Sequence, residues 1–398
     1  MLTRRDVIKA LGVAVASSGA PSLGFAAADT DARFVLVILR GAVDGLALAA
    51  PYGDGNYRPA RGELALDPPG RADGLLRMDG FFGLHPALNT LHKHYTDGQA
   101  IVLHAVASPY RQRSHFDGQD VLESGAAGVG SLRDGWLNRA LGPFDRPSEL
   151  AIALAQNAPL VLRGDHSVSS WAPSRLPDAD ESTIARLQRL YAEDDFFATR
   201  LDQALKSQDI AAGLGGMSTA TARGNEAQQF AELMQSASRF LTATDGPRIA
   251  VVELGGWDTH ANQGASGGAL ANRFAALDAG LEKLHNGLSE TWQKTVVAVV
   301  TEFGRTVHVN GTRGTDHGTG TAALLLGGAV NGGRVIADWP GLAPKQLYQQ
   351  RDLQPTTDIR SVFKAVLHDH MRVPEKVIER EVFPDSSRAG KLENLIVA

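Results

Sequence analysis

Continuous apolar runs along the chain predict the buried strands of a sheet. The clearest are bounded by polar residues or glycine: 34–39, 296–300 and 322–326 are apolar throughout, and 100–106 and 249–254 are each interrupted by one polar residue, His104 and Glu253. Runs that are apolar at every position are typical of parallel strands, because helices cover both faces of a parallel sheet. Two shorter runs, 152–154 and 160–162, are further strand candidates.

Segments with a helical spacing of apolar residues separate these runs. They are predicted at about 85–95, 114–123, 181–207, 225–242, 269–285 and 359–369. Strands that alternate with helices are typical of α/β proteins. We therefore predict one α/β domain over residues 29–398, with a central, mostly parallel sheet flanked by helices. Within it, residues 131–245 contain a proline- and serine-rich stretch and two of these helices, which indicates an inserted helical cap region.

The composition is that of an ordinary globular protein, with 43% hydrophobic and 21% charged residues. A net charge of -5 argues against nucleic acid as the main partner, because phosphate binding requires a basic surface. The chain contains no cysteine, which excludes disulfide bonds and thiolate metal sites.

The first 28 residues are predicted to be an export signal. Arg4 and Arg5 precede a modest apolar run over 10–16, and small residues before Asp29 fit a cleavage site. This pattern resembles a twin-arginine signal, and the alternative is an amphipathic helix with two chance arginines. The segment is too short and too weakly apolar for a stable membrane span. We therefore expect the twin-arginine export machinery to carry the chain to the periplasm or beyond.

Polar residues follow several predicted strands at the point where each strand ends. The carboxyl ends of parallel strands meet at one edge of a sheet, so these side chains are expected to lie together. Carboxylates and imidazoles suit a divalent metal ion, with zinc, calcium, magnesium and manganese as candidates. The alternative is a polar, glycine-rich edge on which the aspartates cap helices. The residues are Asp44, Ser114, Asp258, His260, Glu302, Asp316 and His317.

Ser114 is the candidate nucleophile of this edge. It is expected to begin a helix after the strand at 100–106, where backbone amides and the helix dipole favour an anion. Arg111 and Arg113, just upstream, are placed to clamp an oxyanion through two hydrogen bonds each. The alternative is that Ser114 only caps the helix, and Ser108 is a second hydroxyl near the same turn.

Five motifs carry a resemblance to a known family. They are LRGAVDGL, RSHFDGQDVLESG, GGWDTHANQG, TEFGRT and GTDHGTGTAALLLGG, and they span nearly the whole mature chain. Together they resemble the DUF1501 family of twin-arginine-exported bacterial proteins. That family is similar in turn to the alkaline phosphatase and sulfatase superfamily. The resemblance implies an alkaline phosphatase-like α/β fold and a metal-dependent hydrolase of phosphate or sulfate esters.

The resemblance also implies roles for individual residues. In the superfamily an Asp after the first strand, an Asp/His pair, an Asp-His doublet and a last His hold two divalent ions. Phe303 stands where the histidine of the doublet belongs, so one tight ion is expected, with the second weak or absent. By position, Asp44 would be the first Asp, and Asp258 with His260 would be the pair. Glu302 would replace the acid of the doublet. His317 would be the last His, and Asp316 would be either a further ligand or the residue that orients His317.

The implied reaction is an in-line displacement on a small-molecule or oligomeric ester. Ser114 would attack, while Arg111, Arg113 or Arg305 would neutralise the equatorial oxygens. The alternative is a non-catalytic exported protein that binds a metal or another ligand on the same fold. Phe303 favours that alternative, because it cannot ligate a metal.

Overall fold

A computed structural model describes residues 31–145, 150–173, 181–194, 197–198, 201–202, 204–205 and 225–397 of the chain. The predicted export signal over 1–28 lies outside these residues. None of the helices in the described ranges combines the length and the apolar composition that a membrane span requires.

The described residues form a central sheet in the order β11-β5-β10-β9-β1-β8-β6-β7, with β12 paired to β5. β1 lies inside the sheet and pairs in parallel with both β8 and β9. The predicted α/β class with a mostly parallel sheet is therefore confirmed. The strands are β1 Arg33–Leu39, β5 Ala100–Ala107, β6 Ala151–Ala153, β7 Ser169–Ser170, β8 Ile249–Leu254, β9 Thr295–Thr301, β10 Thr321–Leu326, β11 Arg334–Ile336 and β12 Thr357–Asp358.

β10 departs from the predicted direction. It runs antiparallel to both β9 and β5, although its continuous apolar sequence favoured a parallel strand. The reason is the connection from β9, which contains no helix and returns the chain directly at the same edge of the sheet. A parallel neighbour would have needed a crossover connection to the opposite edge. A continuous apolar run indicates that a strand is buried on both faces, and β10 is buried in this way. It does not indicate whether the strand runs parallel or antiparallel to its neighbours.

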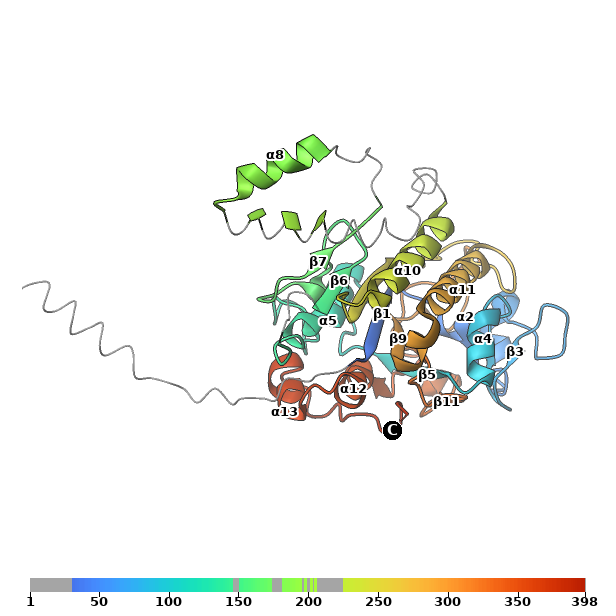
Figure 1. Ribbon diagram of the computed structural model, residues 1–398. Coiled ribbons are helices and arrows are strands. Elements are labelled where there is room, and N and C mark those ends of the chain that lie inside the picture. The colour runs from blue at the N-terminus through green and yellow to red at the C-terminus, as the bar shows by residue number, and fades with distance from the viewer. Residues whose placement is uncertain are drawn as a thin grey trace, which may run out of the picture.

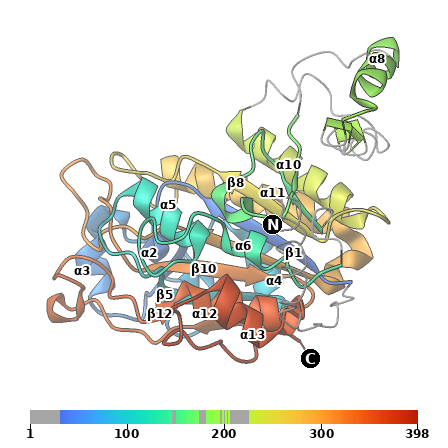
Figure 2. The same ribbon diagram turned by 90° about the vertical axis from the view of Figure 1, so that its left-hand side faces the viewer.

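Helices cover both faces of the sheet (Figures 1 and 2). On β1, Phe34, Leu36 and Ile38 pack on one face, and the alternate residues from Val35 to Leu39 pack on the other. The first face is covered by α5 His115–Ser124, α6 Trp136–Arg139, α12 Ile359–Ala365 and α13 Glu375–Val377. The second is covered by α4 Asn89–Thr96, α10 Glu226–Thr242 and α11 Ala269–Leu288.

The region predicted as an inserted cap contributes mainly to these layers. β6 extends the central sheet from β8, β7 pairs with β6, and α10 packs along α11. α8, Glu181–Tyr191, stands off the sheet in Figures 1 and 2. The run at 160–162 is not a strand but a single 3-10 turn after Pro159, because the Leu162 and Arg163 amides bond to the Pro159 and Leu160 carbonyl oxygens of the same turn rather than to a neighbouring strand.

Smaller elements follow β1. They are α2 Gly45–Leu48, α3 Tyr57–Arg61 and a three-stranded sheet of β2 Ala49–Ala50, β4 Gly83–Leu84 and β3 Leu76–Arg77. Gly41 lies in the turn between β1 and α2 with φ of 120°, and a Cβ there would lie 2.7 Å from the backbone nitrogen of Asp258. The glycine therefore lets the loops after β1 and β8 approach each other at the carboxyl edge of the sheet.

Candidate metal centre

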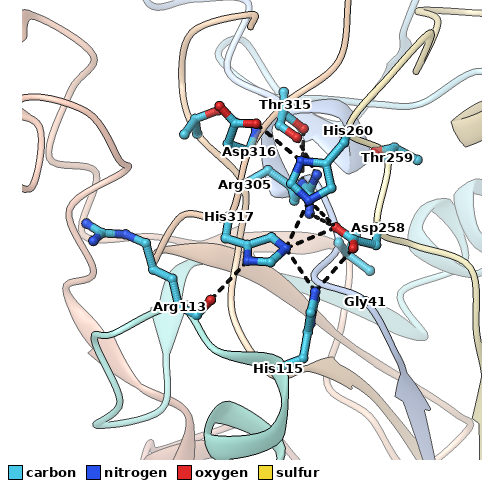
Figure 3. Close-up of polar contacts among 12 residues, drawn as sticks. Gly41, Arg113, His115, Asp258, Thr259, His260, Arg305, Thr315, Asp316 and His317 are labelled. Carbon is cyan, nitrogen blue, oxygen red and sulfur yellow. Dashed lines mark hydrogen bonds and ion pairs between the residues drawn. The ribbon is translucent and has the colours of Figure 1, made fainter. Parts of the chain in front are cut away.

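Imidazole and carboxylate groups from three chain segments meet at this edge (Figure 3). The loop after β8 supplies Asp258 and His260. His115 comes from the first turn of α5, and His317 comes from the β9–β10 loop. Ligand atoms of His115, Asp258 and His317 all lie within 4.8 Å of one another. These residue types at this spacing are what a divalent metal ion requires.

The Nε2 atoms of the histidines converge beside Asp258. His317 Nε2 lies 3.0 Å from His115 Nε2 and 3.0 Å from His260 Nε2. Asp258 Oδ1 lies 3.1 Å from His317 Nε2 and 2.9 Å from His260 Nε2, while Oδ2 lies 3.4 Å from His115 Nε2. Ligand atoms of a tetrahedral zinc ion lie about 3.3 Å apart. The cluster therefore has the spacing of ligands around one ion, with His260 beside the group of three.

The other nitrogen of each ring is held by an oxygen atom. His115 Nδ1 lies 2.7 Å from Glu302 Oε1, and His317 Nδ1 lies 2.9 Å from the carbonyl oxygen of Arg113. His260 Nδ1 lies 3.2 Å from Asp316 Oδ1. Because these oxygens accept, each Nδ1 is assigned as the donor, which leaves the Nε2 electron pairs free. Metal-binding histidines are typically held in this way.

This arrangement of donor groups fits a cation. Two imidazole nitrogens at 3.0 Å attract each other only when a proton or a metal ion lies between them. The hydrogen bond to Glu302 raises the pKa of His115, whereas burial lowers the pKa of His317. A divalent ion would accept the electron pairs of both rings and of Asp258 at once.

Glu302 lies behind His115 rather than beside the other ligands. Its Oε1 accepts from the Gly41 amide at 2.9 Å and its Oε2 from the Thr301 hydroxyl at 2.8 Å. Burial opposes ionisation, but the hydrogen bonds from His115, Thr301 and Gly41 outweigh it and lower the pKa of Glu302. Glu302 therefore has the hydrogen bonds of an ionised group that orients His115. The sequence had instead predicted Glu302 as a metal ligand.

Asp258 is held by Arg305. Burial raises the pKa of Asp258, but the hydrogen bond and charge of Arg305 more than offset this, so the pKa lies below its usual value. Arg305 is itself buried, and it lies opposite His317 in an antiparallel bridge of the β9–β10 loop. Arg305 was predicted from the sequence to neutralise the equatorial oxygens of an ester. In the structure its Nη1 donates to Asp258 Oδ1 instead.

The start of α5 places His115. Arg113 has φ of 66°, a left-handed conformation that is costly for a residue with a side chain, and its carbonyl thereby reaches His317. The ring of Phe303 stacks on His115 with centroids 5.0 Å apart. Gly118 leaves room for that ring, because a Cβ there would lie 2.8 Å from it. Phe303 thus supports a histidine from the apolar side.

Asp44 does not join the group of ligand atoms. Its Oδ1 caps α2 by accepting from Leu46 and Ala47 amides at 3.1 and 3.3 Å. Its Oδ2 accepts from Arg61 and, at 2.6 Å, from Gln263 Nε2. Both oxygens are thus used inside the protein, which differs from the predicted role as a metal ligand.

The two upstream guanidinium groups are also engaged elsewhere. Arg111 donates to the carbonyl oxygens of Ser108 and Tyr110 in its own turn. Arg113 Nε lies 2.7 Å from Asp352 Oδ2, and its Nη2 lies 2.7 Å from Gln349 Oε1. These contacts engage Arg111 through Nη1 and Arg113 through Nε and Nη2, so part of each guanidinium is already used away from the predicted oxyanion clamp. Arg113 contributes its backbone carbonyl instead.

Ser114 occupies the N-cap position of α5 as predicted, but its side chain makes no capping bond. Its amide donates to Tyr110 Oη at 2.9 Å. Within the described residues, no hydrogen bond involves its hydroxyl, which immediately precedes the metal-ligating candidate His115.

His115 is the residue that sequence reasoning did not select. A signal was present, because His115 and Gln119 are four residues apart and therefore lie on one face of α5. Both contact Glu302 Oε1, and Gln119 Nε2 does so at 3.3 Å. A histidine and a glutamine four residues apart at the start of a helix can donate to one acceptor, which here is Glu302 Oε1.

Residues 31–382 of the chain match the family described as "Protein of unknown function (DUF1501)". No curated protein matches the chain.

Solved structures show remote similarity. The phosphonate monoester hydrolase of Agrobacterium radiobacter is 13% identical, with 86% of this chain and 74% of that chain covered and a TM-score of 0.34. The C-terminal periplasmic domain of EcEptC from Escherichia coli, in complex with Zn, is 11% identical, with 93% of each chain covered and a TM-score of 0.35. Ps i-CgsB is 11% identical over 91% of this chain and 77% of that chain, with a TM-score of 0.38. These TM-scores and identities carry no argument about chemistry, so the chemistry of the cluster is derived from its own residues.

Proposed function

The chain belongs to the DUF1501 family, and we propose that it is an exported, metal-dependent hydrolase of phosphate or sulfate esters. The observation that carries this proposal is the convergence of His115, Asp258 and His317 within 4.8 Å. Each of the two rings is held from behind by an oxygen acceptor, as in metal sites where ligand geometry matters.

The openness of the cluster supports catalysis rather than a structural metal. The side chain of Asp258 is 41% exposed and that of His260 is 44% exposed. A structural zinc ion is typically enclosed by four protein ligands, whereas a catalytic one keeps a position open to substrate. With histidine donors, zinc fits better than calcium, magnesium or manganese, which prefer oxygen.

A bound divalent ion would act as a Lewis acid on an ester oxygen. The residues of the chain then have separate tasks: His115, Asp258 and His317 hold the ion, and Glu302 orients His115. His260 is exposed and bonded to Asp316, so it is placed to complete the ligand set or to take a proton.

Ser114 remains the proposed nucleophile. Its hydroxyl oxygen would form a bond to phosphorus or sulfur as the ester oxygen leaves with a proton, and water would then release the Ser114 ester. The support is its position beside His115 and the lack of any hydrogen bond to its hydroxyl within the described residues. Replacing Ser114 by alanine should abolish turnover and leave bound metal unchanged, and equal loss of metal would contradict the assignment.

A non-catalytic metal-binding protein is the second candidate. It is favoured by the engagement of Arg111 and Arg113 in other contacts, because part of each guanidinium group is then unavailable to a charged ester.

Metal analysis followed by an ester screen separates the two candidates. The mature chain, residues 29–398, is analysed for bound ions, stripped with a chelator and reloaded with zinc, manganese, magnesium or calcium. Hydrolysis of 4-nitrophenyl phosphate, bis-4-nitrophenyl phosphate and 4-nitrophenyl sulfate is then followed. Ion-dependent turnover that is lost in His115→Ala supports the hydrolase. Tight metal binding without turnover of any ester favours the binding protein.

Export is tested separately, since it depends on the first 28 residues. Changing Arg4 and Arg5 to lysine should retain the precursor in the cytoplasm, because the twin-arginine machinery reads that pair. Fractionation with antibody detection measures the outcome, and undiminished periplasmic protein in the double variant would remove the export proposal.

A further inference from the structure

A chain of buried hydrogen bonds joins Asp44 to Asp258. Gln263 Nε2 donates to Asp44 Oδ2 at 2.6 Å, and Gln263 Oε1 accepts from Thr315 Oγ1 at 2.7 Å. Thr315 Oγ1 accepts in turn from Arg305 Nε at 3.1 Å, and Arg305 Nη1 donates to Asp258 Oδ1. The first four members of this chain of bonds are each at most 2% exposed, so water does not compete for them. They are Asp44, Gln263, Thr315 and Arg305.

The direction of every bond in this chain is determined. A carboxylate only accepts, so Gln263 must turn its nitrogen toward Asp44 and its oxygen toward Thr315. A guanidinium only donates, so the Thr315 hydroxyl accepts from Arg305 and directs its own proton to Gln263. A polar network in which each group has one satisfied arrangement is rigid, and rotating any member leaves a buried group unpaired.

We propose that Gln263 and Thr315 are positioning residues of the metal centre, acting on the ion through Arg305 and Asp258. The proposal rests on the metal centre described above. Thr315 contacts the guanidinium twice, since its carbonyl also accepts from Arg305 Nη2. Arg305 is thereby held against Asp258 Oδ1, the atom nearest to His317 and His260. Partners that orient a metal ligand typically change metal affinity 10- to 100-fold.

Two threonines provide a matched test. Thr259 Oγ1 donates to the same Gln263 oxygen at 2.8 Å. Unlike Thr315, it does not connect Gln263 to Arg305. Thr315→Val should weaken zinc binding about 10-fold or more, because Arg305 Nε loses its acceptor. Thr259→Val removes a buried hydroxyl of the same kind and should have a much smaller effect. Competition with a chromophoric chelator measures the affinity, and the visible spectrum of the Co²⁺-loaded protein reports the coordination.

A new carboxylate tests the other end of the chain. Gln263→Glu brings two carboxylates together beside Asp44, so the hydrogen bond from residue 263 to Asp44 is lost. This variant should weaken zinc binding and change the Co²⁺ spectrum. Unchanged zinc affinity in Gln263→Glu would overturn the positioning role of Gln263.

Loss of stability alone is separated by a remote control. Asp278 is a buried carboxylate that accepts from the Thr90 and Leu91 amides at the start of α4. Asp278→Asn should lower the melting temperature and leave zinc affinity unchanged. Equal effects of Thr315→Val and Thr259→Val, or none from either, would overturn the proposal. Absence of any tight ion in the unchanged protein would overturn the metal centre as well. Failure to hydrolyse esters would remove only the proposed function.

Discussion

At the scale of single residues, the cluster depends on paired contacts between histidine and carboxylate. Glu302 fixes the Nδ1 of His115, and Asp316 does the same for His260. Asp258 faces all three Nε2 atoms and is charged because Arg305 holds it. Asp258 thus lies on the Nε2 side of the rings, whereas Glu302 and Asp316 lie on the Nδ1 side.

Glu302→Gln should weaken metal binding about 10- to 100-fold, because the neutral amide is a poorer acceptor for the Nδ1 proton of His115. His115→Ala should lower bound metal further. Elemental analysis after dialysis and chelator competition measure both effects. His308→Ala serves as the control, since that side chain is exposed on the same loop. Unchanged affinity in Glu302→Gln would mean that His115 needs no orienting partner.

Phe116 should contribute to substrate choice, because it follows His115 directly and is 86% exposed. An aromatic contact is worth about 0.5–1.5 kcal/mol, so Phe116→Ala should raise KM for aryl esters roughly 2- to 10-fold. Methyl phosphate, which offers no apolar group of that size, should be affected less. Metal content should remain that of the unchanged protein. Val129→Ala, at another exposed apolar residue, provides the control.

At the scale of elements, α5 determines where His115 lies. The helix begins after the left-handed Arg113, ends at Gly125 with φ of 68°, and packs its Gly118 against Phe303. The His115 ring is therefore positioned by the space that Gly118 leaves for Phe303 between α5 and the end of β9.

Gly118→Ala tests this packing. In an exposed helix the change would be stabilising by about 1 kcal/mol. Here the new Cβ would lie 2.8 Å from the buried Phe303 ring, so we expect a loss of about 1–3 kcal/mol and weaker metal binding. Adding Phe303→Leu should relieve the clash and recover stability. Chemical denaturation measures the effect, and a more stable single variant would show that α5 can shift freely.

At the scale of the whole molecule, the three-layer core encloses ionisable groups that carry no charge. Burial lowers the pKa of His104 to about 4, and burial also lowers the pKa of His370 to about 4. His104 Nε2 contacts the carbonyl oxygens of Gly45 and Ala49, and His370 Nε2 contacts that of Arg33. Both rings therefore link β-strands to neighbouring segments in the neutral form.

The stability of the protein should fall as the pH decreases from about 6.5 to about 4. In that window the unfolded histidines bind protons and the folded ones do not, so acid favours unfolding. The loss is about 1.4 kcal/mol per pH unit for each ring, and it levels off below the folded pKa. Denaturation with chelator present, to exclude metal effects, should show a shallower pH slope for His104→Gln. His308→Gln should not change the slope.

Much of this architecture follows from local sequence. The strands at 34–39, 249–254 and 296–300, the start of α5 at Ser114 and the family were predicted and are confirmed. Each depends on neighbours within a few positions, such as an apolar run bounded by glycine. Asp258, His260 and His317 were also expected to converge, because they follow the ends of strands at one edge of the sheet, and they lie together there. Their roles, and the export signal, remain predictions.

What only the tertiary structure decided are the partners of these residues. Glu302 and His115 are separated by 187 positions, and Asp44 and Gln263 by 219. No local pattern shows that Glu302 would hold a histidine, or that Asp44 would meet Arg61 and Gln263 rather than the cluster. The sequence by itself determined that Asp44, Asp258 and Glu302 follow the carboxyl ends of strands, because strand ends are local. The partner that each of them meets, and the arrival of His115 beside them, were decided by contacts between distant segments, since each carboxylate bonds to whichever donors the packed chain brings within reach.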